Sequence, residues 1–143
     1  MAKRNEHIPA LQAAAADDLP LRFSFKYLDF TNGKFRPSDC SPDYLVKLLE
    51  ILHRFSSWTV GYFIDQNNDE HRHIIDFSQT SEKDGFQHIP RIDQEQLGYL
   101  EGWQFGVYPE VYWNEWRAHG ILVADTLYVI WLDEKHLLFP KLW

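Results

Sequence analysis

The stretch "NEWRAHGILVADTLYVIWLDEKHLLFP", residues 114–140, decides the fold class of this chain. It reads as two apolar strands joined by a tight turn at 124–125. Alternation places two sets of side chains on opposite faces of the first strand: Trp116, Ala118, Gly120 and Leu122, and Arg117, His119, Ile121 and Val123. The second strand is apolar on both faces, which predicts a central strand with helices on one side and loops or a partner on the other.

Upstream of the hairpin, three further segments show the two-residue period of strands. Alternating apolar and polar residues occur in 21–30, 71–77 and 103–108. A short helix around 93–100 would shorten the long connection that precedes the third of these segments.

A helix is expected to begin at residue 42. Ser41, Pro42 and Asp43 have the types preferred for the N-cap, the first helical position and the positively polarised first turn. An apolar stripe at three- and four-residue spacing then follows, made of Leu45, Leu48, Leu49, Leu52 and Phe55. The segment 58–65 is interpreted as a second short helix.

These elements predict an α+β fold, an antiparallel sheet of four or five strands with a helix or helical hairpin packed on one face. The 143 residues fit a single domain over 21–143. Residues 1–20 are expected to form a flexible or partly helical leader, because they hold little apolar surface to anchor them.

Composition favours a folded protein of the cytoplasm. The chain has one cysteine, so no intramolecular disulfide can form, and it lacks both a signal-peptide core and an apolar run long enough to span a membrane. Its net charge of −7 repels polyanions at long range and argues against general nucleic-acid binding.

The order of elements over residues 21–139 resembles the RelE/ParE-like toxin superfamily, small proteins that pack a helical hairpin on an antiparallel sheet and often cleave RNA. The ending carries the resemblance, since an Arg-bearing strand, an acidic turn and an apolar strand lead into His136. This chain is longer, more acidic and richer in Trp than the usual member. The resemblance implies a metal-independent endoribonuclease of toxin type, with Arg117, His136 and either Glu82 or Glu115 in the catalytic positions.

The chemistry of such a site requires a base for the ribose 2′-hydroxyl, a cation for the phosphate charge and an acid for the leaving oxygen. Arg117 and His119 project from one strand face about 7 Å apart, so a phosphate would span them. The candidate catalytic residues are therefore Arg117, His119, His136 and Glu82, with RNA as partner and no cofactor. The structural alternatives are an ion pair between Arg117 and an acid such as Asp133, a satisfied sheet histidine at 119 and a capped turn at His136.

Metal and thiol chemistry are weaker hypotheses. His71 and His73 share a strand face, and His88, His119 or His136 would supply a third ligand beside Asp76 or Glu82. The spacing matches no metal motif, so these histidines are interpreted as structural. Cys40 precedes a helix N-terminus, which favours a lowered pKa, but no histidine partner is apparent and we interpret it as an incidental thiol.

A non-enzymatic function is the alternative to the nuclease. Aromatic residues gather toward the C-terminus, namely Trp103, Tyr108, Tyr112, Trp113, Trp116 and Trp143. They fit either a thick aromatic core or a binding patch on an acidic surface that takes a basic protein partner. Such a binding protein would fit a defence, counter-defence or immunity-type component, including one for phage defence. Both a monomer and a dimer fit the sequence.

Overall fold

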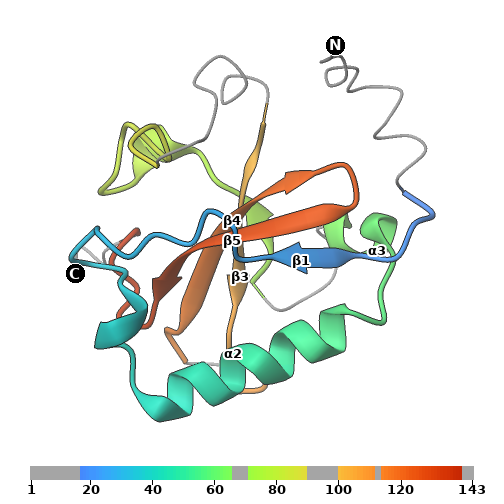
Figure 1. Ribbon diagram of the computed structural model, residues 1–143, viewed down its shortest axis with the longest axis horizontal. Helices are drawn as coiled ribbons and strands as arrows, with labels where there is room; N and C mark the ends of the chain where they lie inside the picture. Colours follow the sequence, from blue (N-terminus) through green and yellow to red (C-terminus); the bar gives the residue numbers. More distant parts are fainter. Residues whose placement is uncertain (1–16, 66–70, 90–99, 112–113, 140–143) are drawn as a thin grey trace.

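The computed structural model describes residues 17–65, 71–89, 100–111 and 114–139, and within them one five-stranded sheet organises the chain (Figure 1). The spatial order is β1-β5-β4-β3-β2. The strands are β1 (Arg22–Ser24), β2 (His73–Ile74), β3 (Gly102–Gly106), β4 (Arg117–Val123) and β5 (Thr126–Asp133). The predicted hairpin of β4 and β5 therefore lies in the middle of the sheet.

The α+β class is confirmed, with one difference in strand direction. Three of the four pairings are antiparallel, but β1 runs parallel to β5, so the sheet is mixed. The strand expected over 21–30 is also shorter, because the chain turns after Ser24 with a bond from Leu28 N–H to Phe25 O. Contact with β5 resumes at Asp29, whose N–H donates to Ile130 O.

The main helix α2 (Pro42–Phe55) begins where the sequence predicts. Ser41 is the N-cap and its hydroxyl accepts from Tyr44 N–H, while proline occupies the first turn. Two long-range bonds fix this end against the sheet: Tyr44 Oη donates to Arg117 O at 2.7 Å, and Glu134 Oε1 accepts from Ser41 N–H at 2.7 Å. The predicted second helix is α3 (Val60–Ile64), capped by Thr59.

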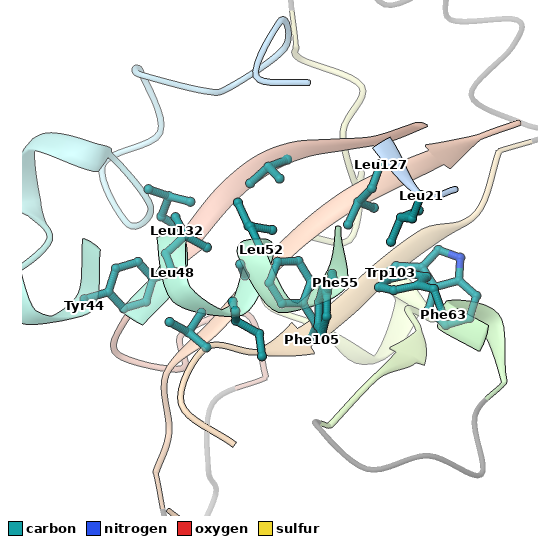
Figure 2. Close-up of a cluster of buried hydrophobic side chains, with 14 of the residues drawn as sticks. Leu21, Tyr44, Leu48, Leu52, Phe55, Phe63, Trp103, Phe105, Leu127 and Leu132 are labelled. Carbon is teal, nitrogen blue, oxygen red and sulfur yellow. The ribbon is translucent and has the colours of Figure 1, made fainter. Parts of the chain in front are cut away.

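One face of the sheet packs against α2 and α3 through an aromatic-rich core (Figure 2). Phe55 of α2 makes edge contacts with Phe63 of α3 and Phe105 of β3, and Phe63 contacts Trp103. Trp103 is buried, as the thick-core interpretation of the aromatic residues predicts. Apolar surface removed from water at about 25 cal/mol per Å² makes this cluster the main stabilising layer on the helix side.

The opposite face, called the loop side below, is covered by irregular segments. Two 3₁₀ turns, η2 (Pro37–Asp39) and η3 (Phe77–Gln79), lie in these segments. Its buried cluster consists of Phe35, Ile75, Phe86, Ile89, Ile121, Ile130, Trp131 and Leu138. Trp131 stacks on Phe35 with ring centroids 4.8 Å apart. The central hairpin is therefore covered on both faces, as its two-sided apolar pattern predicts.

A bulge interrupts the hairpin. Gly120 pairs with Val129 and His119 with Trp131, which leaves Ile130 as an extra residue on β5. Because of the bulge, Ile130 and Trp131 both join the loop-side cluster. The strands approach so closely here that a Cβ on Gly120 would overlap the backbone oxygen of Tyr128.

We predict that Gly120→Ala lowers the free energy of unfolding by about 1–3 kcal/mol or more, because the obstructing atom belongs to a paired backbone and cannot rotate away. Urea unfolding of the purified protein measures this. Gly33→Ala is the matched control, since a Cβ there meets nothing within 4 Å and the change should be neutral or slightly stabilising. Equal stability of the two variants would contradict the close approach at Gly120.

Three earlier expectations fall partly or wholly on residues outside the described ranges. They are the leader over 1–20, of which 17–20 are described, the short helix around 93–100, and the contribution of Tyr112, Trp113 and Trp143 to an aromatic patch. None of the helices in the described ranges is long and apolar enough to cross a membrane.

Candidate functional site

The polar residues of the hairpin gather on the loop side of the sheet. His73 of β2 lies opposite Gln104 of β3, and Gln104 lies opposite His119 of β4. Two residues before His119 along β4, Arg117 lies opposite Asp133 of β5. Directly opposite residues in a sheet share a face, so these side chains form a continuous polar patch under the loops.

His119 and Asp133 form a buried hydrogen-bonded pair. His119 Nε2 lies 3.0 Å from Asp133 Oδ2, and the two side chains are 0% and 1% exposed. The Asp133 carboxylate also accepts from the backbone N–H groups of Leu137 at 2.7 Å and Leu138 at 3.0 Å. Burial by itself raises the pKa of Asp133, but these hydrogen bonds and the neighbouring imidazole bring the pKa below its ordinary 3.8.

The imidazole of His119 is kept neutral by its surroundings. Burial lowers the pKa of His119, an effect that the bond to Asp133 only partly offsets, and the nearby His136 and His73 lower it further. The site therefore pairs an ionised carboxylate with a neutral imidazole whose Nε2–H points at that carboxylate. This resembles the structural histidine that the sequence offered as the alternative to a proton shuttle, except that only Nε2 is hydrogen-bonded and the buried Nδ1 has no partner among the described residues.

Arg117 is directed into the protein. It is 8% exposed, and one guanidinium nitrogen donates to the backbone oxygens of Asn114 at 2.9 Å and Trp116 at 3.0 Å. Burial lowers the pKa of Arg117, while the charges of Asp133 and Glu115 oppose that shift. These contacts engage Nη1 of the cation that a phosphate would need.

His136 follows the end of β5, where the sequence predicts it. Its backbone is left-handed, with φ of 60°, and its Nδ1 lies 2.8 Å from Phe139 O. The side chain is partly buried, so it is the more accessible of the two candidate histidines. Its ring nitrogen contacts the C-terminal backbone, as a capped turn requires.

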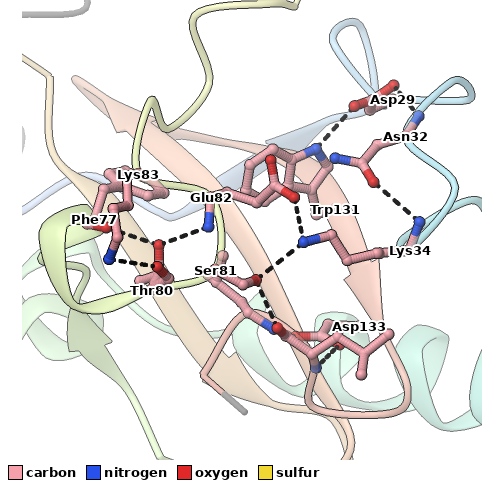
Figure 3. A network of polar contacts seen from close by, with 12 residues as sticks. Asp29, Asn32, Lys34, Phe77, Thr80, Ser81, Glu82, Lys83, Trp131 and Asp133 are labelled. Carbon is pink, nitrogen blue, oxygen red and sulfur yellow. Dashed lines mark hydrogen bonds and ion pairs between the residues drawn. The ribbon is translucent and has the colours of Figure 1, made fainter.

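Glu82 belongs to a different part of the loop side. Its carboxylate pairs with Lys34 Nζ at 2.5 Å, and Lys34 also donates to Ser81 Oγ at 3.2 Å (Figure 3). Ser81 in turn bonds to Leu137 O and Leu138 O. Within the described residues, no hydrogen bond or ion pair joins Glu82 to Arg117, His119 or His136. The structure thus gathers Arg117, His119 and Asp133, with His136 beside them, and gives Glu82 a partner elsewhere.

The described residues contain no group of three metal-ligating side chains arranged to hold an ion. Cys40 differs from a reactive thiol as well. Its burial, together with the charges of Glu134, Asp39 and Asp133, raises the pKa of the thiol to about 11. The lowered pKa that a helix N-terminus favours is therefore not found, and the incidental-thiol interpretation fits.

Two buried polar residues, Gln104 and Asp29, were missed from the sequence. Gln104 is the one polar side chain in the segment 103–107, and it is 4% exposed. Its position in an otherwise apolar strand was the signal from which a buried polar residue could have been predicted. Asp29 accepts from Trp131 Nε1 at 2.9 Å and from Asn32 N–H (Figure 3). It also accepts from the backbone N–H of Thr31. Its role had no local signal, because Trp131 is 102 residues away.

Comparison with models of known families, with curated proteins and with solved structures finds no match for this chain. The candidate site is therefore interpreted from its own geometry.

The His119 and Asp133 pair predicts a pH dependence of stability. The folded-state pKa of His119 lies below the ordinary 6.5, so the unfolded chain binds a proton that the folded protein does not. Stability should fall as pH drops below 6.5, until the folded-state pKa is reached. Asp133 contributes stability that is fully present above its ordinary 3.8 and is lost as pH falls through its lower folded-state pKa.

Urea unfolding at about pH 7.5 and about pH 5.5 measures the first effect. His119→Gln keeps an N–H donor for Asp133 without titrating, so its stability should change less between these two conditions. His88→Gln is the control, because that side chain is 82% exposed, and it should keep the wild-type dependence. The same loss of stability in His119→Gln as in the wild type would remove His119 from the explanation.

Proposed function

We propose that this chain is a non-enzymatic interaction module that binds a basic protein partner through the outer face of α2. The observation that carries the proposal is the exposure of two large apolar side chains there, Val46 at 53% and Leu49 at 64%. They are three residues apart, so they are neighbours on the helix surface. An adjacent apolar pair on a main helix is the kind of feature that partner proteins cover.

Carboxylates surround this pair. Asp43 is three residues before Val46, and Glu50 is four residues after it, so both lie along the same outer line of α2 and both are exposed. Lys47 bonds to Glu50 at 3.1 Å at one edge of the face. An apolar centre with acidic neighbours is complementary to an apolar surface that carries Lys or Arg.

Charge also favours a basic partner over a second copy of this chain. The net charge is −7, and a two-fold contact through α2 would bring Asp43 and Glu50 of two copies together. Like charges across an interface oppose association, whereas a cationic partner would be attracted at long range.

Two of the aromatic residues expected to anchor such a partner, Trp103 and Trp116, are less available than the α2 pair. Trp103 is buried in the helix-side core. Trp116 is partly buried between Tyr44 and Tyr108, with ring centroids 5.7 Å and 6.0 Å away. This favours the aliphatic face of α2 as the docking surface.

The endoribonuclease remains a prediction with less support from the geometry. A base must reach the ribose hydroxyl and a cation must reach the phosphate. His119 is inaccessible to solvent, and Arg117 is 8% exposed with Nη1 already donating to backbone oxygens, so the pair gives a substrate little access.

A pair of model peptides tests the proposal. The isotope-labelled protein is titrated with an amphipathic Lys/Leu helix and with its Glu/Leu counterpart, and amide shifts are followed by NMR. We expect the Lys/Leu peptide to shift Asp43, Val46, Leu49 and Glu50 selectively. The double variant Val46→Gln and Leu49→Gln should bind at least about tenfold more weakly, because burial of each side chain contributes about 1.5–3 kcal/mol.

Val123→Gln is the matched control, since it removes an apolar side chain that is 36% exposed at the end of β4 and should leave binding unchanged. Equal binding of the Glu/Leu peptide, or shifts spread away from α2, would contradict the proposal. RNA cleavage by the wild-type protein that is lost in a folded Arg117→Ala variant would instead establish the nuclease.

A further inference from the structure

The polar row across β2, β3 and β4 contains two hydrogen-bond acceptors that the protein leaves unmatched. His119 is fully buried and Gln104 is 4% exposed. Within the described structure, His119 Nδ1 and Gln104 Oε1 are inaccessible to solvent and have no hydrogen-bond partner. Burying such a group without a partner is unfavourable, because its bonds to water are lost and not replaced.

The orientation of the Gln104 amide follows from His73. His73 Nδ1 lies 3.0 Å from Ile74 O, and because a carbonyl oxygen only accepts, Nδ1 carries the hydrogen. In the neutral ring, Nε2 is then an acceptor, and it lies 2.9 Å from Gln104 Nε2, which donates to it. The amide nitrogen is thereby committed to His73, and Oε1 is the atom left for another donor.

The state of His119 follows in the same way from Asp133. The ionised carboxylate accepts, so His119 Nε2 carries the hydrogen, and Nδ1 of the neutral ring is an acceptor. Gln104 and His119 are cross-strand partners on one face of the sheet. Two neighbouring side chains therefore each carry one unmatched acceptor, and neither acceptor can satisfy the other.

We propose that Gln104 Oε1 and His119 Nδ1 form a buried site for one small neutral molecule that donates two hydrogen bonds, namely a water molecule. A bound water needs about two to four polar partners, and these two atoms supply the first two. Water donates one hydrogen to each acceptor, so both unmatched groups are satisfied without adding a charge beside Asp133.

This site would complete a chain of hydrogen bonds across the sheet. It runs from Ile74 O through His73, Gln104, the bound water and His119 to Asp133, and so joins side chains of β2, β3, β4 and β5. Asp133 continues the chain to the backbone of Leu137 and Leu138. The site is independent of the α2 surface and would exist whether or not that surface binds a partner.

The wild-type protein provides the first test. NMR of the histidine ring nitrogens should report hydrogen on Nδ1 of His73 and on Nε2 of His119 at neutral pH. Magnetization transfer should connect a long-lived water with the ring of His119 and the amide of Gln104. A protonated His119 whose Nδ1–H bonds directly to Gln104 Oε1 would overturn the proposal, as would a protonated His73 with the amide reversed.

A variant gives an independent measurement that counts waters. Gln104→Met removes one acceptor at similar side-chain volume, so relaxation dispersion of the water signal should show the loss of one long-lived water relative to the wild type. Thr80→Val is the control, because Thr80 is also buried but bonds to Phe77 O and Glu82 N–H outside the row. An unchanged count in a folded Gln104→Met protein would refute the site, and if that variant does not fold, the wild-type measurements decide.

Discussion

The loop side of the protein depends on the carboxylate of Asp133. Its two oxygens accept from His119 on the neighbouring strand and from the backbone of Leu137 and Leu138 beyond the end of β5. The C-terminal segment held in this way accepts from Ser81, which links it to the loop containing Lys34. One buried charge thereby holds the segment after β5, to which the Ser81 and Lys34 loops are bonded in turn, and removing it would leave the N–H groups of Leu137 and Leu138 unmatched.

The two sides of the sheet differ in how far the sequence predicts them. The hairpin, α2 and its N-cap at Ser41 follow from local periodicity and capping chemistry, because the residues that determine them are neighbours in the chain. The loop side follows from contacts between distant residues, such as Trp131 with Asp29 and Ser81 with Leu137. The parallel direction of β1 is of the same kind, since it is set by a partner strand about a hundred residues away.

The candidate site shows the same division. The two-residue period places Arg117 and His119 on one face, and the structure agrees. Their burial could not be predicted, because it is produced by loops that the sequence does not assign to that face. The sequence offered Asp133 as an ion-pair partner for Arg117, which the register places opposite it, but the carboxylate bonds to His119, its diagonal neighbour on β4. Periodicity therefore predicts the face of the sheet from which a side chain projects, while the exposure of that side chain to solvent depends on tertiary contacts.

The β4–β5 hairpin holds charged side chains on its loop side because the irregular segments that cover it are positioned by hydrogen bonds to those side chains. Apolar contacts alone do not select one docked arrangement, whereas a buried carboxylate with fixed donors tolerates few alternatives. That structural role competes with catalysis for the same atoms. In a catalytic pair, the acid orients one ring nitrogen and the other faces a substrate. In His119 the second nitrogen, Nδ1, has no solvent access. Any function as a base would require the loop side to open, which would break the bonds from Leu137 and Leu138 that hold the Asp133 carboxylate beside His119.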